Sequence, residues 1–232
     1  IFNLRPEAKF HDGSKLTAED VAFSMLLLKE HGHPNISQPM RVLTDAEVLD
    51  EHRVALQFDG TQSRNYPLGV AAGYPIFSKR YYTAYDFEQS TLTPPLSSGP
   101  YKVGKHAVGR FVEYHKVDDY WANDLPVLRG QKNFQIVRVE FFRERQVAFE
   151  AFKKGTVRYR EEFSSKNWAT EYNFPAVEDG RVVTKVFPDG RPSGAQGWFL
   201  NTRREKFKDP RVREALGYAF DFEWSNKNLF YD

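Results

Sequence analysis

Residues 4–24 read LRPEAKFHDGSKLTAEDVAFS, and this stretch decides the first part of the fold. The alternation of residues 1–5 predicts a strand, which Pro6 ends. Residues 11–14 contain Asp, Gly and Ser in succession and predict a turn. A strand needs a partner and none precedes residues 1–5, so we expect the chain to begin inside a larger protein.

The second half of the same stretch predicts a helix that starts at Thr17. The Thr17 hydroxyl can cap the first free backbone N–H groups, and the Asp20 carboxylate can reach back to the helix start. Three residues at helical spacing form an apolar stripe, namely Val21, Met25 and Leu28. Gly32 and Pro34 predict the end of this helix.

The rest of the chain mixes strand and helix patterns in irregular order. Strands are expected at 46–50 and 52–58, as a hairpin, and at 101–103, 111–116, 135–142, 157–161, 181–187 and 196–201. Helices are expected at 144–154, 164–170 and 209–220, and residues 64–99 are expected to be irregular. This order predicts an α/β or mixed α+β fold.

Composition excludes several classes of protein. Of the 232 residues, 41% are hydrophobic and 28% are charged, a globular balance that argues against disorder. The net charge of +2 is too small for a protein that depends on phosphate neutralisation. With no cysteine, disulfides, thiolate catalysis and iron–sulfur clusters are excluded. No apolar run approaches the roughly 18 residues of a membrane span.

The sequence carries no recognisable catalytic or cofactor motif. It contains no G-x-S-x-G and no phosphate-binding glycine loop. His31 and His33 could chelate a metal, but no carboxylate stands at useful spacing, so an exposed helix end is expected there. Glu161 and Glu162 would point to opposite faces of a strand and cannot act as a catalytic pair. We therefore expect no enzyme activity, no metal and no cofactor.

A basic and aromatic patch near residues 198–213 could suggest a single-stranded nucleic-acid site. Its arginines alternate with Glu205, Asp209 and Glu214, which favours a solvated helix face with ion pairs. We expect no nucleic-acid partner.

Three segments combine aromatic residues, glycines and polar groups at expected strand ends: 155–162, 168–173 and 194–201. Aromatic walls with a few placed polar groups are typical of small-molecule clefts, and an extended ligand can add its main chain to a strand edge. The alternative is that these aromatic residues fill the core of a Phe-rich fold. Both interpretations remain open at this point.

Four motifs, in order along the chain, resemble family 5 extracellular solute-binding proteins of ABC importers. They are residues 4–24, Ser98-Gly99-Pro100-Tyr101, 117–121 and 207–216. Residues 168–170 and 220–226 resemble the YejA-type branch of that family, associated with oligopeptides and peptide-like antibiotics. Arg158 departs from the family pattern, which usually carries an acidic residue after the glycine turn.

The resemblance implies a fold and a function. The fold is type-II periplasmic-binding-protein-like and incomplete, with a small accessory domain (1–97), part of the main first lobe (98–187) and the start of the second lobe (188–232). The function is capture of oligopeptides in an interlobe cleft, in the periplasm, for delivery to ABC permease subunits, by a protein that is monomeric when complete. Alternatives are a cell-wall peptide, a glycan or a peptide-like antibiotic as ligand, or a hydrolase.

By the same resemblance, ligand-facing positions lie near residues 160–161 and 196–198. The candidate ligand-binding residues are Arg160, Glu161, Trp168, Tyr172, Gln196, Gly197 and Trp198. Trp168 and Trp198 would supply a flat apolar wall. Glu161 or Arg160 would meet a ligand terminus or main chain. Gln196 and Gly197 would offer backbone or amide hydrogen bonds.

Overall fold

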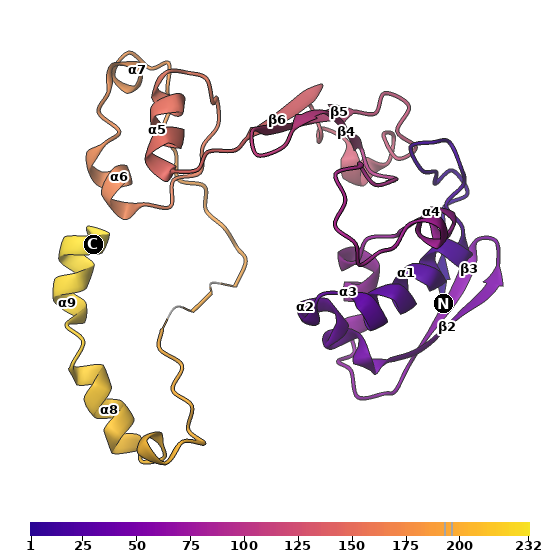
Figure 1. The fold of residues 1–232 in the computed structure, drawn as a ribbon, viewed down its shortest axis with the longest axis horizontal. Coiled ribbons are helices and arrows are strands. Elements are labelled where there is room, and N and C mark those ends of the chain that lie inside the picture. The colour runs from indigo at the N-terminus through magenta and orange to yellow at the C-terminus, as the bar shows by residue number, and fades with distance from the viewer. Residues whose placement is uncertain (193, 196) are drawn as a thin grey trace. The chain divides into compact units, whose positions relative to one another are not determined.

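The computed structural model describes residues 1–192, 194–195 and 197–232 (Figure 1). These residues form two compact units, unit 1 (Ile1–Phe141) and unit 2 (Phe142–Asp232). The lobe boundaries implied by the family resemblance, after residues 97 and 187, fall inside the two units and stay predictions. In the part of the chain just defined, no helix has both the length and the apolar character needed to cross a bilayer.

Unit 1 contains the long helix that the opening stretch predicts, α1 (Ala18–His31). Its start is confirmed at Thr17, whose backbone N–H donates to Asp20 Oδ2 at 2.9 Å. Its end is confirmed at Gly32, whose N–H donates to the Leu28 carbonyl at 3.1 Å. The short helices α2 (Pro34–Ser37) and η1 (Pro39–Val42) follow directly.

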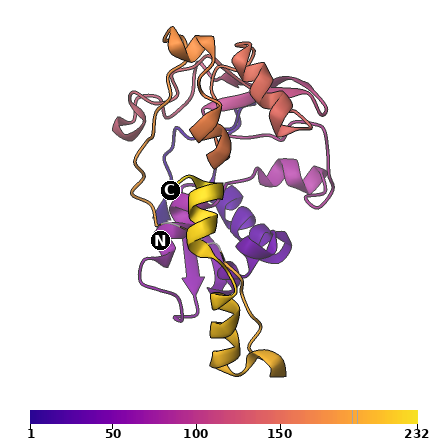
Figure 2. The ribbon, with the colours of Figure 1, turned by 90° about the vertical axis from the view of Figure 1, so that its left-hand side faces the viewer.

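The first sheet of unit 1 consists of β1 (Phe2–Asn3), β2 (Leu43–Asp50) and β3 (Arg53–Phe58). Its order is β1-β3-β2 and both pairings are antiparallel, so the predicted hairpin is confirmed. The strand expected at the start of the chain finds its partner in β3, where Phe2 pairs with Val54. Figures 1 and 2 show α1 lying beside β2 and β3.

The core of unit 1 fills the space between α1 and this sheet. Its largest fully buried apolar side chains are Phe10, Met25, Met40, Leu43 and Val54. Two polar side chains of α1 are also buried and connect it to residues 77–79. Ser24 Oγ accepts from the Phe77 N–H at 2.7 Å, and Asp20 Oδ1 accepts from the Lys79 N–H at 2.8 Å.

These contacts attach the start of α4 (Lys79–Ala84), one of two helices that sequence analysis missed; the other is α3 (Tyr66–Gly73). The expectation that residues 64–99 are wholly irregular is therefore wrong. Pro67 lies in the first turn of α3, and Ser78 Oγ accepts from the Tyr81 N–H at 3.3 Å at the start of α4. Proline and serine are favoured at these positions because they suit the free N–H groups of a helix start.

The second sheet of unit 1 consists of β4 (Tyr101–Ala107), β5 (Phe111–Lys116) and β6 (Ile136–Glu140), antiparallel in the order β4-β5-β6. The three predicted strands are confirmed, with β4 longer than expected. Gly104 lies against the His115 ring, where an added Cβ would come within 2.4 Å of that ring. A short turn, η2 (Pro126–Leu128), lies between β5 and β6.

Unit 2 is helical in its described part. It contains α5 (Arg145–Lys153), α6 (Ser165–Thr170), α7 (Pro175–Glu178), η3 (Glu205–Phe207), α8 (Pro210–Tyr218), α9 (Phe222–Ser225) and a π-helical turn, η4 (Asn226–Phe230). The predicted helices α5, α6 and α8 are confirmed. Gly155 follows α5 with φ +75°, a conformation that glycine adopts without strain.

The prediction of three strands in unit 2 is wrong. The structure forms no strand at 157–161, at 181–187 or in the described residues of 196–201. A strand exists only when another strand receives its hydrogen bonds. The N–H groups of Val157 and Val182 instead bond back to the preceding helices, at the carbonyls of Ala151 and Ala176. Each segment has residues that favour a strand, but the local sequence does not encode a pairing partner.

Candidate functional site

An open cavity of about 900 Å³ in unit 2 gathers four of the seven predicted site residues. We call it the Trp168 cavity. Its walls come from the segment after α5, from α6 and from residues 182–187, with Phe230, Tyr231 and Asp232 at its margin. The four predicted residues in its lining are Arg160, Glu161, Trp168 and Tyr172.

The centre of this region is Glu162, a residue that sequence analysis considered but did not select. Its side chain is only 4% exposed. Arg160 Nε donates to Glu162 Oε2 at 3.1 Å, and the Tyr172 hydroxyl donates to the same oxygen at 3.1 Å. The Ser164 N–H donates to Oε1 at 2.9 Å. Glu162 therefore fixes Arg160, Tyr172 and the start of α6 in one network.

The network shifts two ionisations in opposite directions. Burial acts to raise the pKa of Glu162, but the Ser164 N–H, the Arg160 guanidinium and the Tyr172 hydroxyl outweigh it and leave the pKa below its usual value. Burial, followed by the bond to the Glu162 carboxylate, raises the pKa of Tyr172. Glu162 is thus held as a carboxylate and Tyr172 as a neutral phenol.

Acid should weaken this network. The pKa of Glu162 in the folded protein lies below its unfolded value of 4.5. Its carboxylate therefore stabilises the fold at any pH above 4.5, and this stabilisation is lost as the pH falls through the pKa of the folded state. We expect Glu162→Gln to cost about 1–3 kcal/mol of unfolding free energy at pH 7, because the amide NH₂ would replace one carboxylate oxygen and face the donor or donors that this oxygen accepts from. The cost should shrink toward pH 3. Urea titrations at both pH values measure this.

Glu161→Gln provides the matched control for that experiment, because Glu161 is the exposed neighbour of Glu162. It should change the unfolding free energy by less than about 0.5 kcal/mol at either pH. A pH-independent cost for Glu162→Gln would contradict the assignment of its carboxylate as the stabilising group.

An aromatic cluster backs the cavity. Phe149 of α5 is fully buried, with the Tyr172 ring centroid 5.3 Å away and the Arg160 Cζ 5.2 Å from its own centroid. Trp168 packs on Tyr172 at 5.7 Å and keeps 43% of its surface exposed. Tyr172 and Arg160 therefore support the wall through their internal contacts, while Trp168 presents an open flat face.

Gly197 and Trp198, two of the other predicted residues, are not brought together with this group. Gly197 and Trp198 line a separate hollow of about 610 Å³, formed with α8 and the residues after it, which we call the Trp198 hollow. The Trp198 and Phe220 rings meet edge to face at 5.8 Å, and Trp198 is 75% exposed. Gln196 lies outside the described residues. The role of each of the seven predicted residues in ligand binding stays a prediction.

Unit 1 contains a further cavity, of about 660 Å³, that sequence analysis missed. Tyr81 and Tyr85 stack at 4.5 Å along its wall, and Arg80 forms an ion pair with Asp12. His11 Nε2 donates to the Gly99 carbonyl at 2.8 Å. The spacing of Tyr81 and Tyr85, one helical turn apart, is the sequence feature that could have indicated this wall.

The histidines near the end of α1 have local roles. His33 Nδ1 accepts from the Asn35 N–H at 3.2 Å and so caps α2, while His31 Nδ1 lies 3.3 Å from Glu88 Oε1. Among residues 1–192, 194–195 and 197–232, no group of three or more His, Asp or Glu side chains is placed to hold a metal ion.

The whole chain, residues 1–232, matches the family described as "Bacterial extracellular solute-binding proteins, family 5 Middle". "Probable peptide-binding protein YejA" of Agrobacterium fabrum is 39% identical over 239 residues, which cover 99% of this chain and 39% of that protein. "Peptidoglycan-binding protein YepA" of the same organism is 37% identical over 235 residues, which cover 98% of this chain and 38% of that protein.

Solved structures support the fold. The oligopeptide-binding protein AppA from Bacillus subtilis, in complex with a nonapeptide, matches with a TM-score of 0.71 at 22% identity. The match covers 99% of this chain and 44% of AppA. The chain spans less than half the length of each of these relatives. The mixed α/β fold expected from sequence is confirmed, and it corresponds to part of the fold of AppA. The chain belongs to the family 5 bacterial extracellular solute-binding proteins.

Proposed function

We propose that the whole protein is the periplasmic substrate-binding component of an ABC-type peptide importer, which captures oligopeptides and delivers them to a membrane permease. The observation that carries the proposal is the match of all 232 residues to a solute-binding family, together with a 39% identical relative named as peptide-binding. The open face of Trp168 suits such a ligand, because aromatic walls hold peptide side chains without demanding one sequence.

The proposed mechanism is binding without chemistry. Two lobes would close over the peptide by a hinge motion, and the closed form would dock on the permease. Exclusion of water would strengthen hydrogen bonds to the peptide main chain. Ordered water around the peptide side chains would tolerate varied sequences. Glu162 contributes by holding Arg160 and Tyr172 in place behind Trp168.

Calorimetric titration of the full-length protein tests the ligand class. Oligopeptides of varied length and sequence should bind, whereas free sugars and single amino acids should bind far more weakly. A protein that binds a sugar and none of the peptides would contradict the proposal.

A second candidate ligand is a cell-wall peptide, which the 37% identical relative named as peptidoglycan-binding favours. The same titration separates the two candidates when a cell-wall tetrapeptide is compared with the same peptide attached to its amino sugar and with ordinary peptides of equal length. Tighter binding of either cell-wall form by tenfold or more would favour the second candidate.

Trp198→Ala in the full-length protein should weaken peptide affinity by about 1–3 kcal/mol if the ring is a binding anchor, as buried aromatic anchors typically do. Calorimetry measures the change. Phe199→Ala is the matched control, because Phe199 is 88% exposed and does not contribute to the Trp198 hollow. Unchanged affinity in a folded Trp198→Ala protein would remove Trp198 from the site.

A further inference from the structure

Two cationic side chains in the Trp168 cavity form no ion pair within the part of the chain that the structure describes. Arg158 and Lys185 both contribute to its lining and both are exposed. Within residues 1–192, 194–195 and 197–232, no carboxylate lies within salt-bridge distance of either. Arg160, two residues from Arg158, differs because it is paired with Glu162 at 3.1 Å and is mostly buried.

Two of the three carboxylates in the lining of the same cavity have partners other than Arg158 and Lys185. Glu162 is occupied by its three donors, and Asp232 Oδ1 accepts from the Asn226 amide at 3.2 Å. Glu161, the third carboxylate of the lining, is exposed and forms no ion pair with Arg158 or Lys185 among the described residues. The positive charge of Arg158 is therefore left available.

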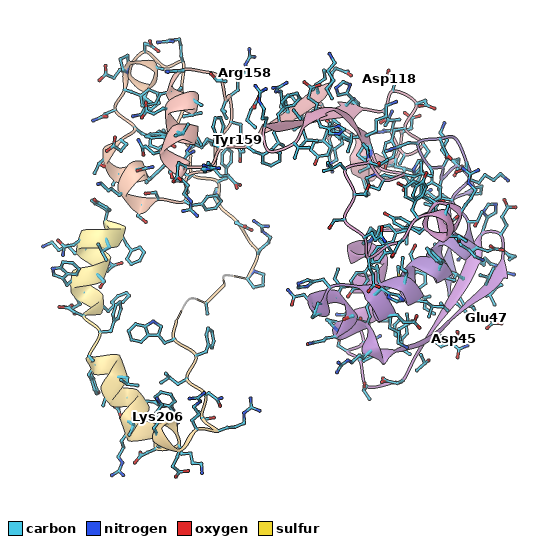
Figure 3. All side chains as sticks on the ribbon, in the orientation of Figure 1. Asp45, Glu47, Asp118, Arg158, Tyr159 and Lys206 are labelled. Atoms are coloured by element: carbon cyan, nitrogen blue, oxygen red, sulfur yellow. The ribbon has the colours of Figure 1, made fainter. Side chains whose placement is uncertain are left out.

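Aromatic side chains lie near these two cations in the sequence. Tyr159 is 71% exposed, and Figure 3 shows it with Arg158 on the segment that follows α5. The Lys185 Nζ lies 5.3 Å from the centroid of the Phe187 ring, a cation–π contact that holds the ammonium without neutralising it. A guanidinium can donate two parallel hydrogen bonds to the two oxygens of one carboxylate, so an arginine is well suited to bind a carboxylate.

We propose that Arg158, assisted by Lys185, receives a carboxylate of the bound peptide, so that the Trp168 cavity selects ligands with a free carboxylate at that position. This inference rests on the proposed peptide-binding function. The carboxylate could be that of the peptide C-terminus or that of an acidic side chain, and the experiment distinguishes the two.

Titration of the full-length protein with matched peptides provides the test. One pair compares a C-terminal free acid with its C-terminal amide, and the other compares an internal Asp with Asn. In the unmodified protein, the carboxylate form of one pair should bind at least tenfold more tightly. Arg158→Gln should reduce that preference to less than threefold, with the affinity for the neutral form nearly unchanged. The preference should also weaken at high salt.

Arg181→Gln is the matched control, because Arg181 is an exposed arginine of the same unit that is paired with Asp179 and does not contribute to the cavity lining. It should keep the preference of the unmodified protein. Equal affinity within both peptide pairs, or a preference that survives Arg158→Gln, would overturn this inference while the peptide-binding function stands. Failure of all four peptides to bind would overturn the proposed function and the inference with it.

Discussion

Replacing Phe149 with alanine is expected to lower the unfolding free energy of unit 2 by about 3–5 kcal/mol. Phe149 is fully buried and contacts the rings of Tyr172 and Phe174 at 5.3 and 6.3 Å. The Lys153 Nζ lies 4.4 Å from its ring centroid. Truncation would leave a cavity behind the Trp168 wall and remove the surface on which Arg160 rests.

Hydrogen exchange of the α5 amides in the full-length protein measures this loss unit by unit, because exchange reports local opening free energies. Phe163→Ala serves as the control, since Phe163 belongs to the same unit and is 80% exposed. Its expected effect is below about 0.5 kcal/mol. Equal protection of α5 in the Phe149→Ala and unmodified proteins would refute the placement of Phe149 at the core of unit 2.

Asp20→Ala is expected to lower the unfolding free energy of unit 1 by about 3–4 kcal/mol, since it leaves three partly buried donors without an acceptor. The carboxylate accepts from the Thr17 N–H at 2.9 Å, the Thr17 hydroxyl at 3.1 Å and the Lys79 N–H at 2.8 Å. It thus closes the start of α1 and attaches the start of α4. Exchange of amides in both helices should accelerate together.

Glu19→Gln is the natural comparison for Asp20, because Glu19 lies in the same helical turn and forms only an exposed ion pair with Lys79 at 3.0 Å. Exposed pairs contribute about 0–1 kcal/mol. If Asp20→Ala and Glu19→Gln had similar costs, the buried bridge between α1 and α4 would not exist in solution. Faster exchange in α1 alone would show that Asp20 caps its own helix without attaching α4.

Helix starts were predictable from sequence because their determinants are local. Thr17 with Asp20, Ser164 and Asp209 each act within three residues of their own helix start, and each is observed as a cap. The β2–β3 hairpin was predictable for the same reason, since its strands are joined by a two-residue turn at Glu51 and His52. Ser78 and Pro67 carry the same kind of local information, and it was overlooked.

Strands in unit 2 were not predictable in this way, because a strand depends on a partner that may lie anywhere in the chain. Val182 lies in a segment, 181–187, that turn residues precede and follow. Its N–H nevertheless donates to the Ala176 carbonyl at 2.7 Å, and the segment forms no strand pairing. The opposite case is Phe2, whose partner Val54 lies some fifty residues downstream. Periodicity reports which face is apolar and does not report what covers that face.

The candidate site was predictable in part. Residue type and position predicted a site that includes Trp168, and four of the seven predicted residues share one cavity. Sequence could not choose between Glu161 and Glu162, because only the fold shows which carboxylate meets Arg160, Tyr172 and the Ser164 N–H. The separate location of Trp198 was equally hidden, since it depends on packing against Phe220.

The most direct test of the proposed role is mass spectrometry of peptides recovered from the full-length protein. The protein would be incubated with a defined peptide mixture and separated from unbound peptide. It would then be denatured, and the masses of the released peptides would be measured. We expect retained peptides with masses identical to those supplied, in about one copy per protein. Recovery of cleaved or modified peptides, or of no peptide at all, would contradict a function of capture without chemistry.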